Sequence, residues 1–498
     1  MPEITRVPFN RSALPAPRCA LGVALGLGLL AGAAFAQPTA VTPRSPACGG
    51  EPTLEIFLVD DLEDGSDRVP GDGLCQNEQF RCNLRAAIQE ANALGSPGSP
   101  PSCLILVGGV HRLSRPGRNE DDALFGDLDV HRALRIQGIG PFPAFTLIEA
   151  QGLDRVLQVH ATPNFRPRLS IANLRLSGGH TALPDTAGGG AILSAGELVL
   201  EDVELVGHRA DQGHGGAVAM LASTPVTTQL TLSRVLLASN EARAGHGGAL
   251  WLQGWANAPL ALLAEEVVAQ DNRALDGGAM AGTGEVAMAI RGSAFFGNAA
   301  SQGAGGIAVG SGARLQLDAS TIHANAGSGG ALALRNAGTV RVSHLTLTEN
   351  VGPGLHARAT PVELSASILH GNSAADLDVD GLLNSLRSGF NVLGGGSIDG
   401  ISLAELKPAT WWVGADPALG AMGSVGGFAP GRMPLSGSPV IDGYRQLPAG
   451  QPACSGVDQR GLTRPQVLTQ GIAPGEGCDI GAIELGERLY ASGFESAP

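Results

Sequence analysis

Apolar residues recur along the middle of the chain in a fixed pattern that ends on asparagine. Counting back from Asn240, Leu237, Leu232 and Leu230 stand at positions −3, −8 and −10, and the same three positions are apolar before Asn298. The pattern reads L-x-L-x-x-V-x-L-x-x-N, so its apolar residues pair at i and i+2 as on one face of a strand. It predicts two short strands joined by a bend. The asparagines that end the copies are Asn240, Asn272, Asn298, Asn325, Asn350 and Asn372, and two earlier copies end on Gly179 and His208.

A second phrase, Gly-Gly followed by a small residue and an aliphatic one, recurs between the asparagines. Its glycine pairs begin at residues 215, 247, 277, 305 and 329, so the interval is 24 to 32 residues. The aliphatic residues after each pair add a third short strand. Repeats of this length that cannot bury their own apolar face are typical of a solenoid. We therefore expect an all-β, right-handed parallel β-helix of about eight or more coils with three short strands each.

Stacked coils give both phrases a structural interpretation. Glycine at a corner supplies a positive φ and leaves no Cβ to meet the coil above. Asparagine tolerates the left-handed conformation, and its amide can hydrogen-bond its counterparts along a stack. A phosphate-binding loop would instead need a following helix and a lysine or hydroxyl residue at fixed spacing. We expect the asparagine row to be architectural.

The start of the chain has the features of a secretory signal peptide. Arg6, Arg11 and Arg18 precede an apolar run that closes on Ala34-Phe35-Ala36. No later stretch is apolar over the roughly 20 residues that a membrane helix needs. We expect cleavage after residue 36 and a secreted or cell-surface protein.

Charge and cysteine content further limit the classes of partner and the cellular compartment expected for this protein. The formal net charge is −14, which argues against nucleic acid as a partner, and the single lysine argues against a polybasic membrane surface. Six cysteines remain after the leader, an even number that favours disulfides in an exported protein. From their positions we expect the pairs Cys75–Cys82, Cys454–Cys478 and Cys48–Cys103.

Several motifs resemble known exported bacterial β-helix proteins. Residues 71–94, "GDGLCQNEQFRCNLRAAIQEANAL", resemble the CSLREA domain, with Asn83 as the helix N-cap and Gly95 at its end. "LSGSPVIDG", "DQRGLTRP" and "CDIGAIE" resemble the choice-of-anchor Q region, and "FFGN" with the Gly-Gly phrases resembles polymorphic outer-membrane proteins of the pectin-lyase-like fold. The resemblance implies a signal peptide (1–36), an N-terminal helical cap (37–112), a parallel β-helix (113–395), an irregular C-terminal region (396–486) and a tail (487–498).

The pectin-lyase-like fold also includes polysaccharide lyases and glycosidases, so a catalytic site must be considered. Such a site needs paired carboxylates, or a basic residue opposite acidic calcium ligands, on one face. The best candidates fall near equivalent corners of consecutive coils, and we expect them to be loop residues facing solvent. They are Asp211, His214, His246, Asp271, Arg273 and Asp276.

Two further features concern ligands. The acidic run of residues 60–67 could hold calcium but lacks the spacing of a calcium-binding loop, so we expect a solvated turn and no cofactor. Trp251 and Trp255 could stack on sugar rings, although we expect at least one of them to be buried. The sequence favours a monomeric, non-catalytic protein that contacts a polysaccharide or cell-surface glycan. A polysaccharide lyase or glycoside hydrolase is the alternative, and a structural spacer the third possibility.

Overall fold

The computed structural model describes most of the chain after the leader. The described residues belong to one compact unit within Ala40–Pro498. The expected signal peptide and the tail (487–498) lie outside the described residues, in which no helix is long and apolar enough to cross a membrane. The described residues are 48, 52–118, 120–140, 146–183, 185–223, 225–379, 386–389, 391–394, 397–399, 411–445, 456–464 and 477–486.

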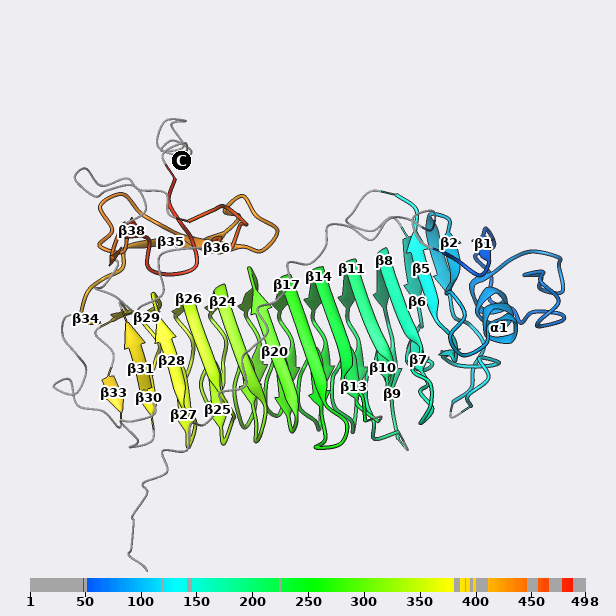
Figure 1. Ribbon diagram of the computed structural model, residues 1–498, viewed down its shortest axis with the longest axis horizontal. Helices are drawn as coiled ribbons and strands as arrows, with labels where there is room; N and C mark the ends of the chain where they lie inside the picture. The colour runs from blue at the N-terminus through cyan, green and yellow to red at the C-terminus, as the bar shows by residue number, and fades with distance from the viewer. Residues whose placement is uncertain are drawn as a thin grey trace, which may run out of the picture. The chain divides into compact units, whose positions relative to one another are not determined.

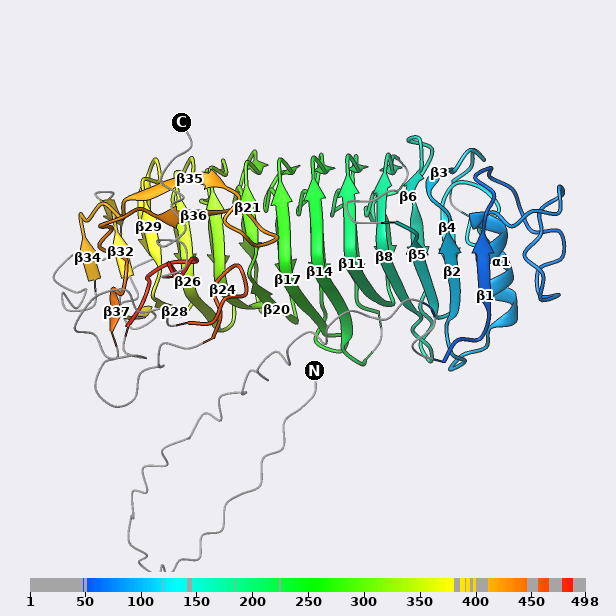
Figure 2. The same cartoon turned by 90° about the horizontal axis from the view of Figure 1, so that it is seen from above.

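Three parallel sheets run along the stacked coils and form a parallel β-helix, which confirms the predicted fold class (Figures 1 and 2). An 11-stranded sheet contains the strands that follow the Gly-Gly phrases. Its strands are β4 (Leu128–Val130), β7 (Leu157–Val159), β10 (Ile192–Ser194), β13 (Val218–Leu221), β16 (Leu250–Gln253), β19 (Met280–Thr283), β23 (Ile307–Val309), β25 (Leu332–Arg335), β27 (Leu355–Arg358), β30 (Ala375–Val379) and β33 (Ser397–Asp399).

An 18-stranded sheet carries the longer strands of the repeat. Its strands are β1 (Ile56–Val59), β2 (Ser102–Leu106), β3 (Gly109–Arg112), β5 (Leu134–Gly138), β6 (Thr146–Glu149), β8 (Arg168–Ser177), β11 (Glu197–Val206), β14 (Thr228–Ala238), β17 (Leu260–Gln270), β20 (Val286–Arg291), β21 (Ala294–Phe296), β24 (Arg314–His323), β26 (Val340–Thr348), β28 (Val362–Ser365), β29 (Ile368–His370), β31 (Leu386–Gly389), β32 (Asn391–Leu393) and β34 (Trp411–Val413). β1 pairs with β2 in parallel, so stacking begins within the segment expected to form the cap.

A five-stranded sheet of two-residue strands completes the coil between the asparagine and the Gly-Gly corners. Its strands are β9 (His180–Thr181), β12 (Arg209–Ala210), β15 (Glu241–Ala242), β18 (Arg273–Ala274) and β22 (Ala299–Ala300).

Register between neighbouring coils places apolar side chains above one another. Leu230 lies opposite Leu198 on one side and Leu262 on the other, and Leu232 lies opposite Leu200. All five side chains are at most 1% exposed. Because each coil is too thin to bury these residues alone, the core exists only where coils stack. The apolar positions of the repeat are therefore confirmed as the core of the solenoid.

Each long strand bends at one residue in the left-handed conformation. In β14 this residue is Arg234, with φ of 51°, and in β17 it is Glu266, with φ of 55°. The two polar positions in L-x-L-x-x-V contain this bend. A non-glycine residue with positive φ is strained, so stacking must hold it in place.

The Gly-Gly phrase forms a corner for the two reasons expected. Gly247 has φ of 68°, and a Cβ on Gly248 would overlap the carbonyl oxygen of Gly278 in the next coil. The first glycine supplies the conformation and the second the close approach.

The cap helix α1 (Leu84–Leu94) covers the first coils, and Asn83 is its N-cap as predicted, accepting from the Ala86 N–H at 3.0 Å. Arg85, on this helix, is fully buried although charged. Its guanidinium pairs with Asp64 at 2.7 Å and donates to the carbonyl oxygens of Ala123 and Asp127 at 3.1 Å each. The helix is thus anchored by hydrogen bonds as well as by its apolar face, because a buried guanidinium needs all its donors satisfied.

The C-terminal region folds back over the 18-stranded sheet. It contains two antiparallel pairs, β35 (Leu419–Gly423) with β36 (Gly431–Pro434) and β37 (Tyr444–Arg445) with β38 (Gly477–Cys478). Thr321 Oγ1 donates to Gln459 Oε1 at 2.6 Å, and the Ala482 N–H donates to Thr346 Oγ1 at 2.9 Å. The motifs near the C-terminus thus contact coils more than a hundred residues earlier.

Two disulfides lie among the described residues, Cys48–Cys103 and Cys75–Cys82, the pairings expected from the sequence. Cys478 is also disulfide-bonded, and its expected partner Cys454 lies outside the described residues.

Candidate functional site

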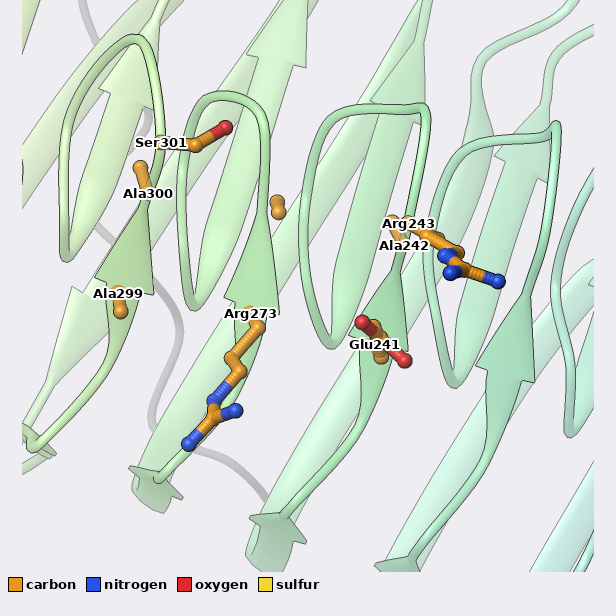
Figure 3. Close-up of a pocket in the computed structure, with 8 residues that line it drawn as sticks. Glu241, Ala242, Arg243, Arg273, Ala299, Ala300 and Ser301 are labelled. Carbon is orange, nitrogen blue, oxygen red and sulfur yellow. The ribbon is translucent and has the colours of Figure 1, made fainter.

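A groove follows the five-stranded sheet across three consecutive coils. It encloses about 390 Å³ and is lined by Glu241, Ala242, Arg243, Arg273, Ala274, Ala299, Ala300 and Ser301. Figure 3 shows these residues on adjacent coils, with the polar side chains projecting from the ribbon. Ala242 and Ala274 are buried, whereas Arg243 and Arg273 are exposed. Short side chains thus form the floor and long polar ones the rim.

The two rim arginines differ from most of the arginines in the part of the chain that the structure describes. Arg209, Arg234 and Arg335 each pair with a carboxylate within 3.0 Å. Arg243 and Arg273 have no ion-pair partner within the part of the chain that the structure describes. Two guanidinium groups with unused donors therefore face solvent at one groove.

The corner beside this sheet carries the asparagine row. Asn298 Oδ1 accepts from the backbone N–H of Asn272 at 3.0 Å and from its side-chain amide at 2.8 Å. The Asn298 amide donates in turn to Asn325 Oδ1 at 2.8 Å and to the Ala269 carbonyl oxygen at 2.9 Å. The same bonds join Asn240, Asn325, Asn350 and Asn372 to their neighbours. Every described asparagine of the row is turned into the stack, where it is not available to a ligand.

One detail of that corner differs from the expectation. The left-handed residue is not the asparagine but the residue before it, for example Ser239 with φ of 55° and Asp271 with φ of 56°. The asparagine side chain instead reaches the next coil and hydrogen-bonds to it. The backbone of the asparagine must therefore have a conformation that directs the side chain toward that coil. Asp271 is thereby a corner residue, exposed and adjacent to the buried Asn272.

The candidate acids of the sequence do not converge. Asp211 accepts from His180 Nε2 at 3.0 Å and from Arg209 Nε at 2.5 Å. Burial works to raise the pKa of Asp211, but these two partners outweigh it and hold the pKa below its usual value. Asp276 accepts from the Ala304 N–H at 2.6 Å and pairs with Arg335 at 2.5 Å. Each carboxylate is thus engaged by its own set of partners.

The two candidate histidines form an aromatic stack with a tryptophan. The rings of His214 and His246 lie 5.1 Å apart, and that of His214 lies 4.5 Å from Trp251. His214 Nδ1 accepts from the His246 N–H at 3.0 Å. Burial, and then the neighbouring imidazole of His246, lower the pKa of His214. Trp251 is 8% exposed and Trp255 is 55% exposed, which confirms that at least one tryptophan is buried.

The acidic run of residues 60–67 is not a solvated turn, and that expectation is wrong. Asp61 accepts from Asn77 Nδ2 at 2.8 Å, Asp64 pairs with Arg85, and Asp67 accepts from the Gln76 N–H at 3.0 Å. Asp61 and Asp67 are buried. These carboxylates fasten the cap, because a buried charge needs hydrogen-bonded partners.

A cluster of buried titratable groups in the first coils was not recognised as a site from the sequence. Asp127, Asp129 and Asp154 are at most 4% exposed, and Arg155 and His160 lie among them. Burial raises the pKa of Asp127 to about 7, against the charge of Arg155. The sequence shows these groups in two segments: Asp127 and Asp129 alternate with apolar residues in "GDLDV", and "LDRVLQV" in the next coil contains Asp154 and Arg155.

No protein-family model and no curated protein matches this chain. Among solved structures it is similar to the A-module of the Azotobacter vinelandii mannuronan C-5 epimerase AlgE6, at 15% identity and TM-score 0.37 over 66% of this chain and 92% of that one. It is also similar to the pectate lyase Pel9A, at 11% identity and TM-score 0.37 over 87% and 97%. A variant of the alginate lyase AlyGC matches at 12% identity and TM-score 0.28 over 73% and 54%. No activity or site residue follows from similarity at this level.

Proposed function

We propose that this protein is an exported, non-catalytic β-helix protein that contacts glycans through the groove on the five-stranded sheet. The observation that carries the proposal is the pair of arginines without ion-pair partners, Arg243 and Arg273, above a floor of alanines. A shallow groove with small floor residues leaves room for a chain of sugar rings. Guanidinium, carboxylate and hydroxyl groups at its rim supply donors and acceptors for sugar hydroxyls.

The stacked architecture suits a polymeric ligand. Glu241 and Arg273 occupy the same position in successive coils, since the two residues are partners in the pairing of β15 with β18. Neighbouring coils are about 4.8 Å apart, so a row of such positions presents repeated hydrogen-bonding groups along the stack. A repeating polysaccharide can contact several coils at once, which adds affinity without a deep pocket.

The absence of catalysis is proposed from the state of the candidate acids. A general acid must be protonated near the working pH, which usually requires a raised pKa. Asp211 has the opposite shift, and both oxygens of Asp276 are engaged. A lyase or hydrolase at these corners, the alternative function, would need groups that are free to exchange protons.

Export and family membership belong to the same proposal. The leader-like segment 1–36 and the disulfides favour an oxidising compartment. Membership of the CSLREA and choice-of-anchor Q proteins, with the domain limits given above, rests on motifs alone. Adhesion is the use that fits an extended binding face on such a protein.

Glycan binding by the full secreted chain tests the proposal. Binding to a panel of plant, algal and bacterial polysaccharides would be measured by affinity electrophoresis and then by calorimetry on any ligand found. Replacing Arg243 and Arg273 with Ala should weaken binding roughly tenfold or more, since each charged hydrogen bond contributes about 1.5–3 kcal/mol. Arg168→Ala, an exposed arginine on β8, is the matched control and should bind normally. Unchanged binding in the double variant, or no binding to any glycan, would refute the proposed groove.

A further inference from the structure

An imidazole and two carboxylates meet where the loop before β4 crosses the first coils. His160 Nε2 lies 2.6 Å from Asp129 Oδ1 and 4.0 Å from Asp121 Oδ1. The three ligand atoms all lie within 4.8 Å of one another. Asp129 comes from β4, His160 follows β7 in the next coil, and Asp121 belongs to the loop. Three segments of the chain thus contribute one donor each.

The positions of these donors are fixed by their surroundings. The second oxygen of Asp129 accepts from the Ala123 N–H at 2.8 Å. The ring of His131 stacks on that of His160 at 4.6 Å, and His131 Nε2 lies 2.6 Å from the Asp121 carbonyl oxygen. Outer contacts of this kind orient ligating groups in metal sites. The side chain of Asp121 is 74% exposed, so the cluster is open to solvent on one side.

The charge around the cluster favours a cation. Asp127 and Asp154, like Asp129, are buried in the first coils. Arg155 lies 3.3 Å from Asp127, and Arg118 lies 3.9 Å from Asp154. Arg155 also pairs with Asp185, so five carboxylates, counting Asp121 and Asp129, share these two guanidinium groups and one imidazole. An added cation would reduce their mutual repulsion.

We propose that Asp121, Asp129 and His160 form a zinc(II) site that fastens the loop to the first coils. Imidazole nitrogen with carboxylate oxygen is a donor set for zinc and related transition metals, whereas calcium takes oxygen ligands alone. Zinc ligands lie about 2.0–2.2 Å from the ion, so small side-chain rotations bring the three donors into place. Binding displaces the proton shared by His160 Nε2 and Asp129 Oδ1, and that proton goes to solvent. Three protein ligands leave a fourth position for water.

Zinc binding to the full chain, after dialysis against chelator, tests the site. Calorimetry with zinc chloride should show a stoichiometric site whose affinity falls as pH decreases from 7 to 5.5, because the proton competes for His160. Asp121→Asn and His160→Ala should each weaken that binding at least tenfold, while Asp122→Asn, an exposed neighbour in the same loop, should not. Zinc should raise the melting temperature of the Asp122→Asn protein but not of the Asp121→Asn protein.

The possible results of the zinc experiments can be distinguished from one another and from a failure of the proposed glycan binding. Asp121 is exposed, so Asp121→Asn tests the site even if His160→Ala does not fold. Equal zinc binding by Asp121→Asn and Asp122→Asn would show that zinc binds elsewhere, and no stoichiometric binding would show that Asp129 and His160 form only an ion pair. Either result overturns the zinc site. Glycan binding does not depend on these residues, and its loss in the groove variants would leave the zinc result unaffected.

Discussion

The backbone N–H of His208 donates to the side-chain Oδ1 of Asn240 at 3.0 Å, which places a histidine in a row otherwise made of asparagine. His208 Nδ1 accepts from the Gly179 N–H at 3.1 Å, as an asparagine oxygen would, and its Nε2 lies 2.9 Å from the Leu176 carbonyl oxygen. The neutral imidazole with its proton on Nε2 therefore reproduces both bonds of the amide. Protonation of Nδ1 would remove the acceptor of the Gly179 N–H. His208 is therefore the position at which acid would break the hydrogen-bonded row.

The first prediction concerns the pH dependence of stability. Burial lowers the pKa of His208 to about 4, whereas an unfolded histidine has a pKa near 6.5. Between these values the unfolded chain binds more protons, so the stability that neutral His208 provides is present above pH 6.5 and is lost as pH falls toward 4. The loss should be on the order of 3 kcal/mol. Unfolding in denaturant from pH 7 to 4 would measure it.

His208→Asn is the control for that measurement, because asparagine keeps the row and does not titrate. Asp127 and Asp479 have pKa values raised to about 7, mainly by burial, and act in the opposite direction, but they are unchanged in the variant. The difference between the two proteins therefore isolates His208. Parallel stability curves would contradict the assignment.

The second prediction tests the asparagine row directly. Asn298→Ala or Asn325→Ala should lower the free energy of unfolding by about 1 to 3 kcal/mol, because buried partners on two neighbouring coils lose their bonds. Asn257→Ala, on an exposed loop, should change stability by less than about 0.5 kcal/mol. Loss of glycan binding without loss of stability would instead mean that the row contacts a ligand.

The third prediction concerns the attachment of the C-terminal region. The buried guanidinium of Arg464 pairs with Glu484 at 2.7 Å and donates to the carbonyl oxygen of Gly481 at 2.8 Å. Arg464→Met should cost about 3–5 kcal/mol, since it leaves a buried carboxylate unpaired. Limited proteolysis should then cut residues 411–486 faster. Arg112→Met, which breaks the solvent-exposed pair of Arg112 with Glu149, should have little effect.

The fourth prediction decides between binding and catalysis. With calcium present, the purified protein should not shorten pectate or alginate, as measured by release of new chain ends. Replacing Asp211, Asp271 and Asp276 together with Asn should leave any glycan retention largely intact. Depolymerisation that disappears in the triple variant would establish an enzyme and refute the non-catalytic function.

The fifth prediction concerns the disulfide of the C-terminal region. Peptide mapping under non-reducing conditions should link Cys454 to Cys478, as expected from the way they bracket the "DQRG" segment. A bond between Cys454 and any other cysteine would contradict this pairing.

The sequence by itself determined the strands and corners of each coil. Leu230, Leu232 and Leu237 mark two strands by spacing alone, and Gly247 and Asn240 mark its corners, because these preferences depend on neighbours within a few residues. Repetition of that spacing then requires stacking, since no single repeat buries its apolar face. The fold class, the buried rows and the corner positions follow from local chemistry repeated along the chain.

Only the tertiary structure decided which polar side chains meet. Asp129 and His160 are 31 residues apart on adjacent coils, and Arg85 and Asp64 are 21 apart, but neither pair belongs to the repeated apolar, Gly-Gly or Asn positions. Their contacts depend on the number of residues in each coil and loop, because this number determines which residues of neighbouring coils lie next to one another. The same holds for the groove, where Glu241 and Arg273 adjoin because their coils stack. Local patterns specify strands and corners, whereas pairing between coils depends on the register of the whole stack.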